Sequence, residues 1–323
     1  MQRRQFLATA PLVGAAATLG GLAPSLARAA SHSGGGSAQV PAYQRFAVGD
    51  MTVTCLGDGS LHIGPDSLIG IEADAYTELM RAQFRDPETY PTSVNAFAIQ
   101  RGDETILVDA GTADAMGPGL GRLPRSLEAA GIDPASVTRL LATHLHPDHV
   151  AGALSGQDAM FPNAELVVSE TDRAFWSDEG NFSGAPEMMQ NFANLARSVL
   201  SAYSDRLVTF SGEEDIGSGI TSMPLPGHTP GHSGYMLSSG DDSLLIWADI
   251  VHVPPVQFAR PDVAIGFDVD PEQAVETRQR TMDMVATDRL QVAGSHIGFP
   301  GVVNVEAAED GYRMIPAVYH YDV

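Results

Sequence analysis

The segment Thr143-His144-Leu145-His146-Pro147-Asp148-His149 directly follows a short apolar run that ends at Ala142. It places three imidazoles and one carboxylate within residues 144–149. These four side chains do not share one helical face, so a buried helical stripe does not explain them. A loop at the end of a strand can aim all four at one point, and histidine with aspartate suits zinc, iron, cobalt or manganese. The segment therefore predicts a metal site at a strand end.

Further along the chain, three apolar runs are each followed by a residue that can bind a metal. A second metal ion would need such ligands and a bridging group, because two-metal sites hold their ions close together. The candidates are His228 in Gly227-His228-Thr-Pro-Gly231-His232, Asp249 after the run 243–248, and His296 after the run 290–293.

The pattern of apolar residues from Ser93 onward predicts strands that alternate with helices, which is typical of a layered α/β fold. The chain before Ser93 is less regular. Residues 43–55 predict a strand pair with a turn at Gly49-Asp50, and Gly57-Asp58-Gly59 should end the second strand. Residues 60–92 have weak periodicity and predict a long surface segment. We expect strands near 93–100, 105–109, 137–142, 165–168, 207–210, 219–224, 233–238 and 243–247, and helices near 122–131, 170–177, 186–203 and 271–286.

Charge and cysteine content narrow the class of partner and of fold. All 18 basic side chains are arginine, and 40 acidic side chains leave a formal net charge of -22. Nucleic-acid binding needs a basic surface that displaces counterions, so we expect no nucleic-acid partner. The candidate metal site favours a small-molecule substrate instead. The single cysteine, Cys55, cannot form an internal disulfide, and its alternating surroundings predict a buried strand position.

The N-terminal residues predict an export signal. Arg3-Arg4-Gln5-Phe6-Leu7, an apolar stretch and Ala27-Arg28-Ala29 form the three parts of a twin-arginine-type signal peptide over residues 1–29. Residues 30–41 predict a flexible linker and residues 42–323 one domain. We therefore expect a periplasmic or secreted protein, with no stable membrane insertion after the signal is cleaved.

The complete ligand set, His144-x-His146-x-Asp148-His149 with His228, Asp249 and His296, resembles that of the metallo-beta-lactamase superfamily. Other motifs resemble methyl parathion hydrolase and its relatives, including quorum-quenching lactonases, over essentially the whole mature chain. They include Leu107-Val-Asp-Ala-Gly111, Phe161-Pro-Asn163, Ala174-x-Trp176 and Val256-Gln-Phe258. The resemblance implies a four-layer αβ/βα sandwich with its site at the common edge of two sheets.

The resemblance also implies a role for each ligand. His144, His146 and His228 would hold one metal ion, Asp148, His149 and His296 a second, and Asp249 would bridge them. The ions would be divalent, with zinc expected first and manganese, cobalt or iron as alternatives. A metal-bridging hydroxide would attack an ester, a lactone or a phosphotriester, with Asp148 and Asp249 as the catalytic carboxylates.

The sequence also predicts roles for residues near the expected metal ligands. Asp109 either orients a ligand imidazole or is a turn carboxylate, and His232 is expected to be structural. His32, His62 and His320 have no motif context and are expected not to be ligands. The residues expected to line the substrate pocket are Met116, Trp176, Phe192 and His252, with a surface position as the alternative for His252. Met116 stands where methyl parathion hydrolase has an aromatic residue, so lactones and carboxylic esters join phosphotriesters as candidate substrates.

Two alternative functions have to be considered. A glyoxalase II-like thioester hydrolase shares the ligands, and a non-catalytic metal-binding protein would keep them without turnover. A class B beta-lactamase usually has cysteine where Asp249 stands and arginine where His149 stands, which argues against that activity. The family that this chain resembles implies that the protein forms a homodimer.

Overall fold

The computed structural model describes residues 39–319 of the chain. The predicted signal peptide, 1–29, and most of the predicted linker, 30–41, lie outside the described residues and stay predictions. Within the described part, no helix has the length and apolar content needed to cross a membrane.

The described residues build two seven-stranded sheets. The first has the order β1 (Ala42–Val48), β2 (Met51–Ile63), β4 (Tyr90–Arg101), β5 (Glu104–Val108), β6 (Arg139–Leu141), β9 (Glu165–Ser169) and β10 (Leu207–Phe210). The second has the order β11 (Asp215–Gly217), β12 (Ile220–Pro224), β13 (Ser233–Ser239), β14 (Asp242–Ala248), β16 (Gln291–Gly294), β17 (Val302–Ala308) and β18 (Gly311–Pro316).

Strand direction determines where the loops gather. Strands β5, β6, β9 and β10 run parallel to one another, and so do β14 and β16 in the second sheet. Parallel strands release their chain at the same edge of the sheet, and ligand sites form there. Asp109, the segment 143–149, Asp249 and His296 follow the ends of these strands, so the fold carries all of them to such edges.

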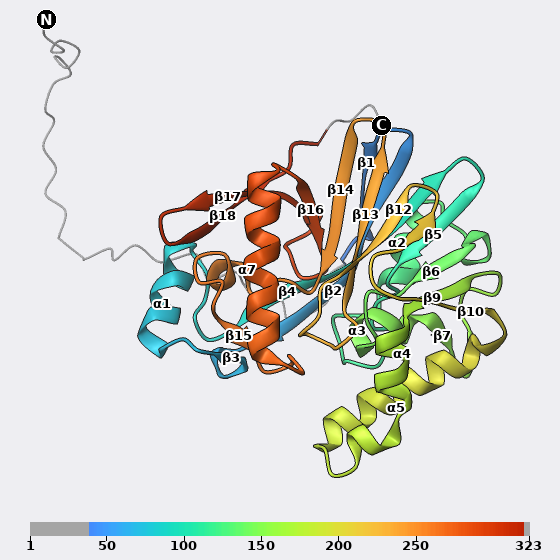
Figure 1. The fold of residues 1–323 in the computed structure, drawn as a ribbon, viewed down its shortest axis with the longest axis horizontal. Helices are drawn as coiled ribbons and strands as arrows, with labels where there is room; N and C mark the ends of the chain where they lie inside the picture. Colours follow the sequence, from blue (N-terminus) through green and yellow to red (C-terminus); the bar gives the residue numbers. More distant parts are fainter. Residues whose placement is uncertain (1–38, 320–323) are drawn as a thin grey trace, which may run out of the picture. The chain divides into compact units, whose positions relative to one another are not determined.

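Side-chain alternation along the strands produces the layers. Val108 of β5 and Ile246 of β14 belong to an apolar cluster shared by the two sheets. Their neighbours Leu107 and Trp247 point to the opposite faces, which helices cover. The helices α2 (Leu123–Ala129), α4 (Glu170–Ser177) and α5 (Glu187–Ala202) pack on the first sheet, and α7 (Pro271–Thr287) packs on the second (Figure 1). The predicted four-layer αβ/βα sandwich is therefore confirmed.

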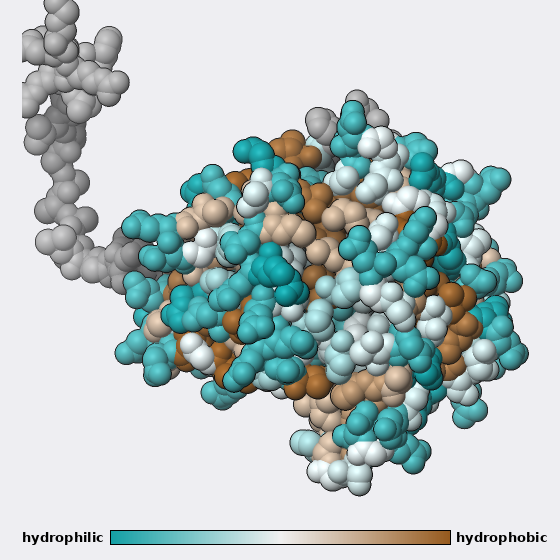
Figure 2. Space-filling view, in the orientation of Figure 1, coloured by the Kyte–Doolittle hydropathy of each residue, from teal (hydrophilic) through white to brown (hydrophobic). Residues whose placement is uncertain are grey.

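The outer face of α7 is exposed to solvent. Figure 2 shows mainly hydrophilic residues over this face, with small apolar patches between them. Asp270 caps the helix by accepting a hydrogen bond from the backbone N–H of Gln273, and Pro271 occupies the first turn.

Cys55 is fully buried between the sheets, as predicted.

The prediction of a long surface segment over residues 60–92 is wrong. Strand β2 continues to Ile63 through an irregularity between Gly57 and Gly59, so the glycines bend the strand without ending it. Tyr76 and Met80 of α1 (Ala73–Ala82) are buried in a satellite core. The elements here are too short to give a clear period, and the surface that buries them comes from residues 253–265, far along the chain. Besides α1, the short elements of this segment are η1 (Pro65–Ser67) and β3 (Leu68–Ile69). Strand β3 pairs with β15 (Ala264–Ile265), and α1 contacts α6 (Pro254–Gln257).

Several short elements complete the fold. They are η2 (Pro134–Ser136), α3 (Pro147–Val150), η3 (Ala151–Ala153), β7 (Leu154–Ser155), β8 (Asp158–Ala159), η4 (Glu179–Phe182) and η5 (Ser204–Arg206).

Replacing Ile246 tests the core between the sheets. The side chain is fully buried, so Ile246→Ala should lower the free energy of unfolding by about 2–5 kcal/mol because it leaves a cavity. Chemical denaturation measures the loss. Ser243→Ala, at an exposed position of the same strand, is the control and should change stability by less than about 0.5 kcal/mol. Equal effects of the two substitutions would contradict the assigned core.

Candidate metal centre

The segment 143–149 is part loop and part helix. His144 and His146 lie on the loop after β6, whereas Asp148 and His149 lie on α3. Pro147 starts this helix, where its missing N–H costs nothing and its fixed φ suits the first turn. The prediction of a loop therefore holds for the first two ligands only. The change from loop to helix lets four closely spaced side chains point toward one region.

The structure brings together all seven side chains predicted as metal ligands. Each is buried, with at most 8% of the residue exposed. Their donor atoms form overlapping groups in which every atom lies within 4.8 Å of the others. The groups are His144–His146–His228, His144–His149–Asp249, Asp148–His149–His296 and His228–Asp249–His252.

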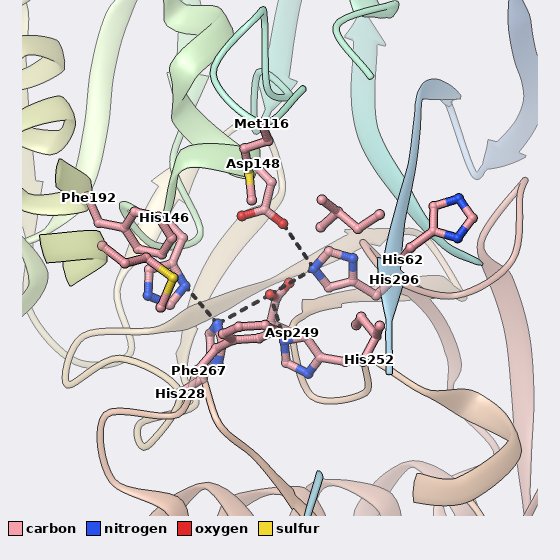
Figure 3. A pocket seen from close by; sticks show the side chains of 13 residues that line it. His62, Met116, His146, Asp148, Phe192, His228, Asp249, His252, Phe267 and His296 are labelled. Carbon is pink, nitrogen blue, oxygen red and sulfur yellow. Dashed lines mark hydrogen bonds and ion pairs between the residues drawn. The ribbon is translucent and has the colours of Figure 1, made fainter. Parts of the chain in front are cut away.

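Asp249 lies at the centre of the cluster. Its Oδ2 is 3.0 Å from Nε2 of His296 and 3.3 Å from Nε2 of both His149 and His228. Figure 3 shows Asp249 between His228, His252 and His296 at the floor of a cavity. On one side His146 Nδ1 lies 2.9 Å from His228 Nε2, and on the other Asp148 Oδ2 lies 3.3 Å from His296 Nε2. One carboxylate thus joins a three-histidine group to a group that contains a second carboxylate.

The donor set fits divalent metal ions. Among the described residues, His146 Nε2, His149 Nε2 and Asp249 Oδ1 are buried without a hydrogen-bond partner. A buried polar atom without a partner is costly, and here several such atoms converge. Imidazole nitrogens and carboxylate oxygens facing each other are the ligand set expected for zinc and related ions.

Burial and charge set the protonation of the cluster. Burial lowers the pKa of His144 and His146 well below the ordinary range, so both imidazoles are neutral and able to bind a cation. Burial would lower the pKa of His228 and His296 as well, but nearby carboxylates, chiefly Asp249, raise them to about 9 and about 10. Metal binding at these two residues would therefore release protons.

Hydrogen bonds behind the cluster orient the imidazoles. Nδ1 of His149 is 2.8 Å from Asp109 Oδ2, so Asp109 makes the contact expected of a residue that orients a ligand. Nδ1 of His228 is 2.8 Å from Asp268 Oδ1, and Nδ1 of His296 is 2.8 Å from the Ser93 carbonyl. Sequence reasoning missed Asp268, which belongs to no recognisable motif and lies 40 residues from its partner.

The other histidines occupy different places. His232 contacts the Leu225 carbonyl through Nδ1 and the backbone N–H of Asp249 through Nε2, and it belongs to no metal-ligand group. His62 is exposed at the cavity wall and is likewise outside those groups. His32 and His320 lie outside the described residues.

A cavity of about 250 Å³ opens above the cluster. Met116, Phe192 and His252 line it, in agreement with their predicted placement in the pocket. Sequence reasoning missed other wall residues, because they lie on segments without a recognisable motif. These are Leu61, His62, Ile63 and Phe267; Met188 also lines the wall.

The prediction that Trp176 lines the substrate pocket is wrong. Trp176 is 0% exposed and stacks on Phe182 in the core beneath α4. Its ring lies 5.4 Å from that of His146, but Trp176 is not among the residues that line the cavity. The motif correctly predicted that Trp176 lies near the site, but it gave no information on whether the ring would face the cavity or the core.

His252 lines the pocket as predicted, but it also contacts the cluster directly. Its Nε2 is 3.1 Å from Asp249 Oδ2, which makes it an eighth side chain in the cluster. The side chain of Gln257 accepts hydrogen bonds from the backbone N–H groups of His252 and Val253, and so fixes the turn that carries this histidine.

With this fold and this cluster, comparison with known families gives a clear result. The chain belongs to the metallo-beta-lactamase superfamily, whose family model matches residues 89–290. Curated relatives are named N-acyl homoserine lactonase AttM: the chain is 29% identical to that of Azorhizobium caulinodans over 113 residues and 31% to that of Agrobacterium fabrum over 115. Each match covers 34% of this chain and 40% of the relative, so the chain spans about 40% of the length of these relatives.

Solved structures are similar over most of the chain. A hydrolase named AbOPH, in the beta lactamase superfamily, is 34% identical with a TM-score of 0.82, covering 87% of this chain and 99% of that one. AidC, a dizinc quorum-quenching lactonase solved with a product, has the same TM-score and coverage at 23% identity. At that identity AidC supports the fold alone.

Removing Asp249 tests the assignment of the cluster. Asp249→Ala deletes a carboxylate that belongs to two of the four groups and contacts a histidine of each of the other two, so it should lower metal content sharply and reduce hydrolysis to background. Elemental analysis of metal per chain and an esterase assay measure both effects. Asp241→Ala, at an exposed turn, is the control and should keep metal and activity. Near-normal activity of Asp249→Ala would refute the assignment.

Replacing Trp176 tests its corrected place. Because the ring is fully buried, Trp176→Ala should lower the free energy of unfolding by about 3–5 kcal/mol. Met116→Ala, on the cavity wall, should instead change KM or substrate preference with little loss of stability. Denaturation curves and steady-state kinetics separate the two. A stable Trp176→Ala protein with only a raised KM would restore the original prediction.

Proposed function

We propose that this protein is a dinuclear metal-dependent hydrolase whose first substrate class is lactones and carboxylic esters. One observation carries the proposal: Asp249 lies between a three-histidine group and the group formed by Asp148, His149 and His296. This is the arrangement that two closely spaced cations need, with one shared carboxylate and separate ligands on either side.

The cluster would hold two divalent ions, with zinc expected first. Such ions would lower the pKa of a bound water toward neutrality and polarise a substrate carbonyl. His144, His146 and His228 would hold one ion, Asp148, His149 and His296 the other, and Asp249 both. The neutral imidazoles favoured by burial suit this role, because a protonated imidazole cannot bind a metal.

Asp148 contacts the histidine cluster and also lines the cavity. Its Oδ2 faces His149 and His296, yet the residue also lines the cavity, and its side chain is about 10% exposed. A carboxylate so placed can take up a proton and return it to the leaving group. We therefore assign Asp148 a proton-transfer role in addition to ligation.

The cavity wall favours an apolar, uncharged substrate. Met116, Phe192 and Phe267 line it, and His62 is the lining residue with a polar side chain that lies outside the donor cluster. Such a wall gives apolar contact to an acyl or aryl group but offers few hydrogen bonds to hydrated anions. The relatives named N-acyl homoserine lactonase support lactones as the first class.

Export is a separate proposal and depends on the sequence alone. The paired arginines and the Ala27-Arg28-Ala29 segment favour a periplasmic or secreted protein, since the twin-arginine route carries folded proteins.

A substrate panel tests the proposed function. Zinc- and manganese-loaded protein should hydrolyse acyl lactones and aryl esters, and Asp249→Ala should not. Methyl parathion and a glutathione thioester serve as comparison substrates. Preference for the thioester would favour the glyoxalase II-like alternative. Two metals per chain without turnover of any substrate would favour a metal-binding protein and overturn the proposal.

A further inference from the structure

A second buried carboxylate lies behind the cluster, outside the predicted ligand set. Asp172, in the first turn of α4, is 0% exposed. Its Oδ2 accepts hydrogen bonds from the backbone N–H of Leu145 at 3.0 Å and from Trp176 Nε1 at 3.2 Å. Its Oδ1 accepts one from the backbone N–H of Gly231 at 2.9 Å.

Asp172 has N–H donors in place of a cationic partner. Among the ion pairs of the described residues none includes Asp172, and the chain contains no lysine. A buried carboxylate is costly unless it is satisfied, and N–H groups that converge on both oxygens can stabilise it. Their positions are therefore coupled to that of Asp172.

The two backbone donors belong to two different loops that carry predicted metal ligands. Leu145 lies between His144 and His146 on the loop after β6, in the first sheet. Gly231 follows His228 by three residues on the loop after β12, in the second sheet. One carboxylate thus connects the loops across the interface between the sheets, where His146 and His228 come within 2.9 Å.

Glycine at position 231 makes this connection possible. A Cβ added there would lie 2.3 Å from the backbone nitrogen of Asp172, closer than real Cβ atoms approach. The loop carrying His228 can therefore reach the start of α4 only with glycine at this position.

We infer that Asp172 is a positioning residue that sets the separation of the His144–His146 loop from His228, and with it the metal affinity of the three-histidine group. The inference relies on the proposed metal binding. The other group is held by other contacts: His149 by Asp109 and His296 by the Ser93 carbonyl. Loss of Asp172 should therefore weaken one of two metal sites selectively.

Asp58 provides a matched control. It is also 0% exposed, and it accepts hydrogen bonds from the backbone N–H groups of Thr112, Gly121 and Leu123. None of these donors lies on a ligand loop. Asp58→Asn and Asp172→Asn therefore make the same chemical change in a similar environment, and only one of them touches the loops that carry ligands.

The experiment makes two measurements on each variant: thermal denaturation, and zinc binding by titration against a chromophoric chelator. Both variants should lose thermal stability. Only Asp172→Asn should weaken one of the two zinc-binding steps, by about 10- to 100-fold, as other residues that support metal ligands do. Asp172→Glu, which keeps the charge but moves the carboxylate, should weaken the same step and serves if the asparagine variant does not fold.

Two results would overturn the inference. One is wild-type zinc affinity at both steps in the Asp172 variants, and the other is an equal loss in Asp58→Asn. A wild-type protein that binds two zinc ions but hydrolyses nothing would refute the proposed function and leave the role of Asp172 standing.

Discussion

The structure depends on the electrostatics of one crowded region, where buried imidazoles and carboxylates converge on Asp249. Bringing so many lone pairs together without cations is unfavourable, and several donor atoms remain unpaired. Three of the clustered imidazoles are held by hydrogen bonds from residues outside the cluster. Asp109, Asp268 and the Ser93 carbonyl hold the far nitrogens of His149, His228 and His296, and these contacts fix the direction in which each free nitrogen points.

Strand direction makes such support possible. Strands β6, β14 and β16 release loops that carry predicted ligands at a sheet edge because each runs parallel to a neighbour. The apolar cluster between the sheets holds these edges against each other, so precision at the site derives from packing far from it. Asp172 adds a direct polar connection between the loops, which packing alone does not provide.

Much of this could be predicted from the sequence, for identifiable physical reasons. The segment 143–149 is dense enough in ligands to exclude ordinary core or surface positions, and the apolar runs before Asp249 and His296 marked strand ends. Trp176 was misplaced because a motif gives proximity along the chain but not the side on which a ring packs. Asp172 and Asp268 were missed because neither belongs to a recognisable motif, and the residues of the ligand segments that they contact, Leu145 and His228, lie 27 and 40 positions away.

Part of the cavity wall comes from segments other than those that form its floor. The predicted metal ligands lie on α3 and on loops that follow core strands, whereas Met116, Met188 and Phe267 come from separate connecting segments and the start of α5. Substitutions in those segments can reshape the wall without moving a metal ligand. Substrate range can therefore diverge among descendants of this protein while the reaction itself is inherited unchanged, which makes the scaffold readily evolvable.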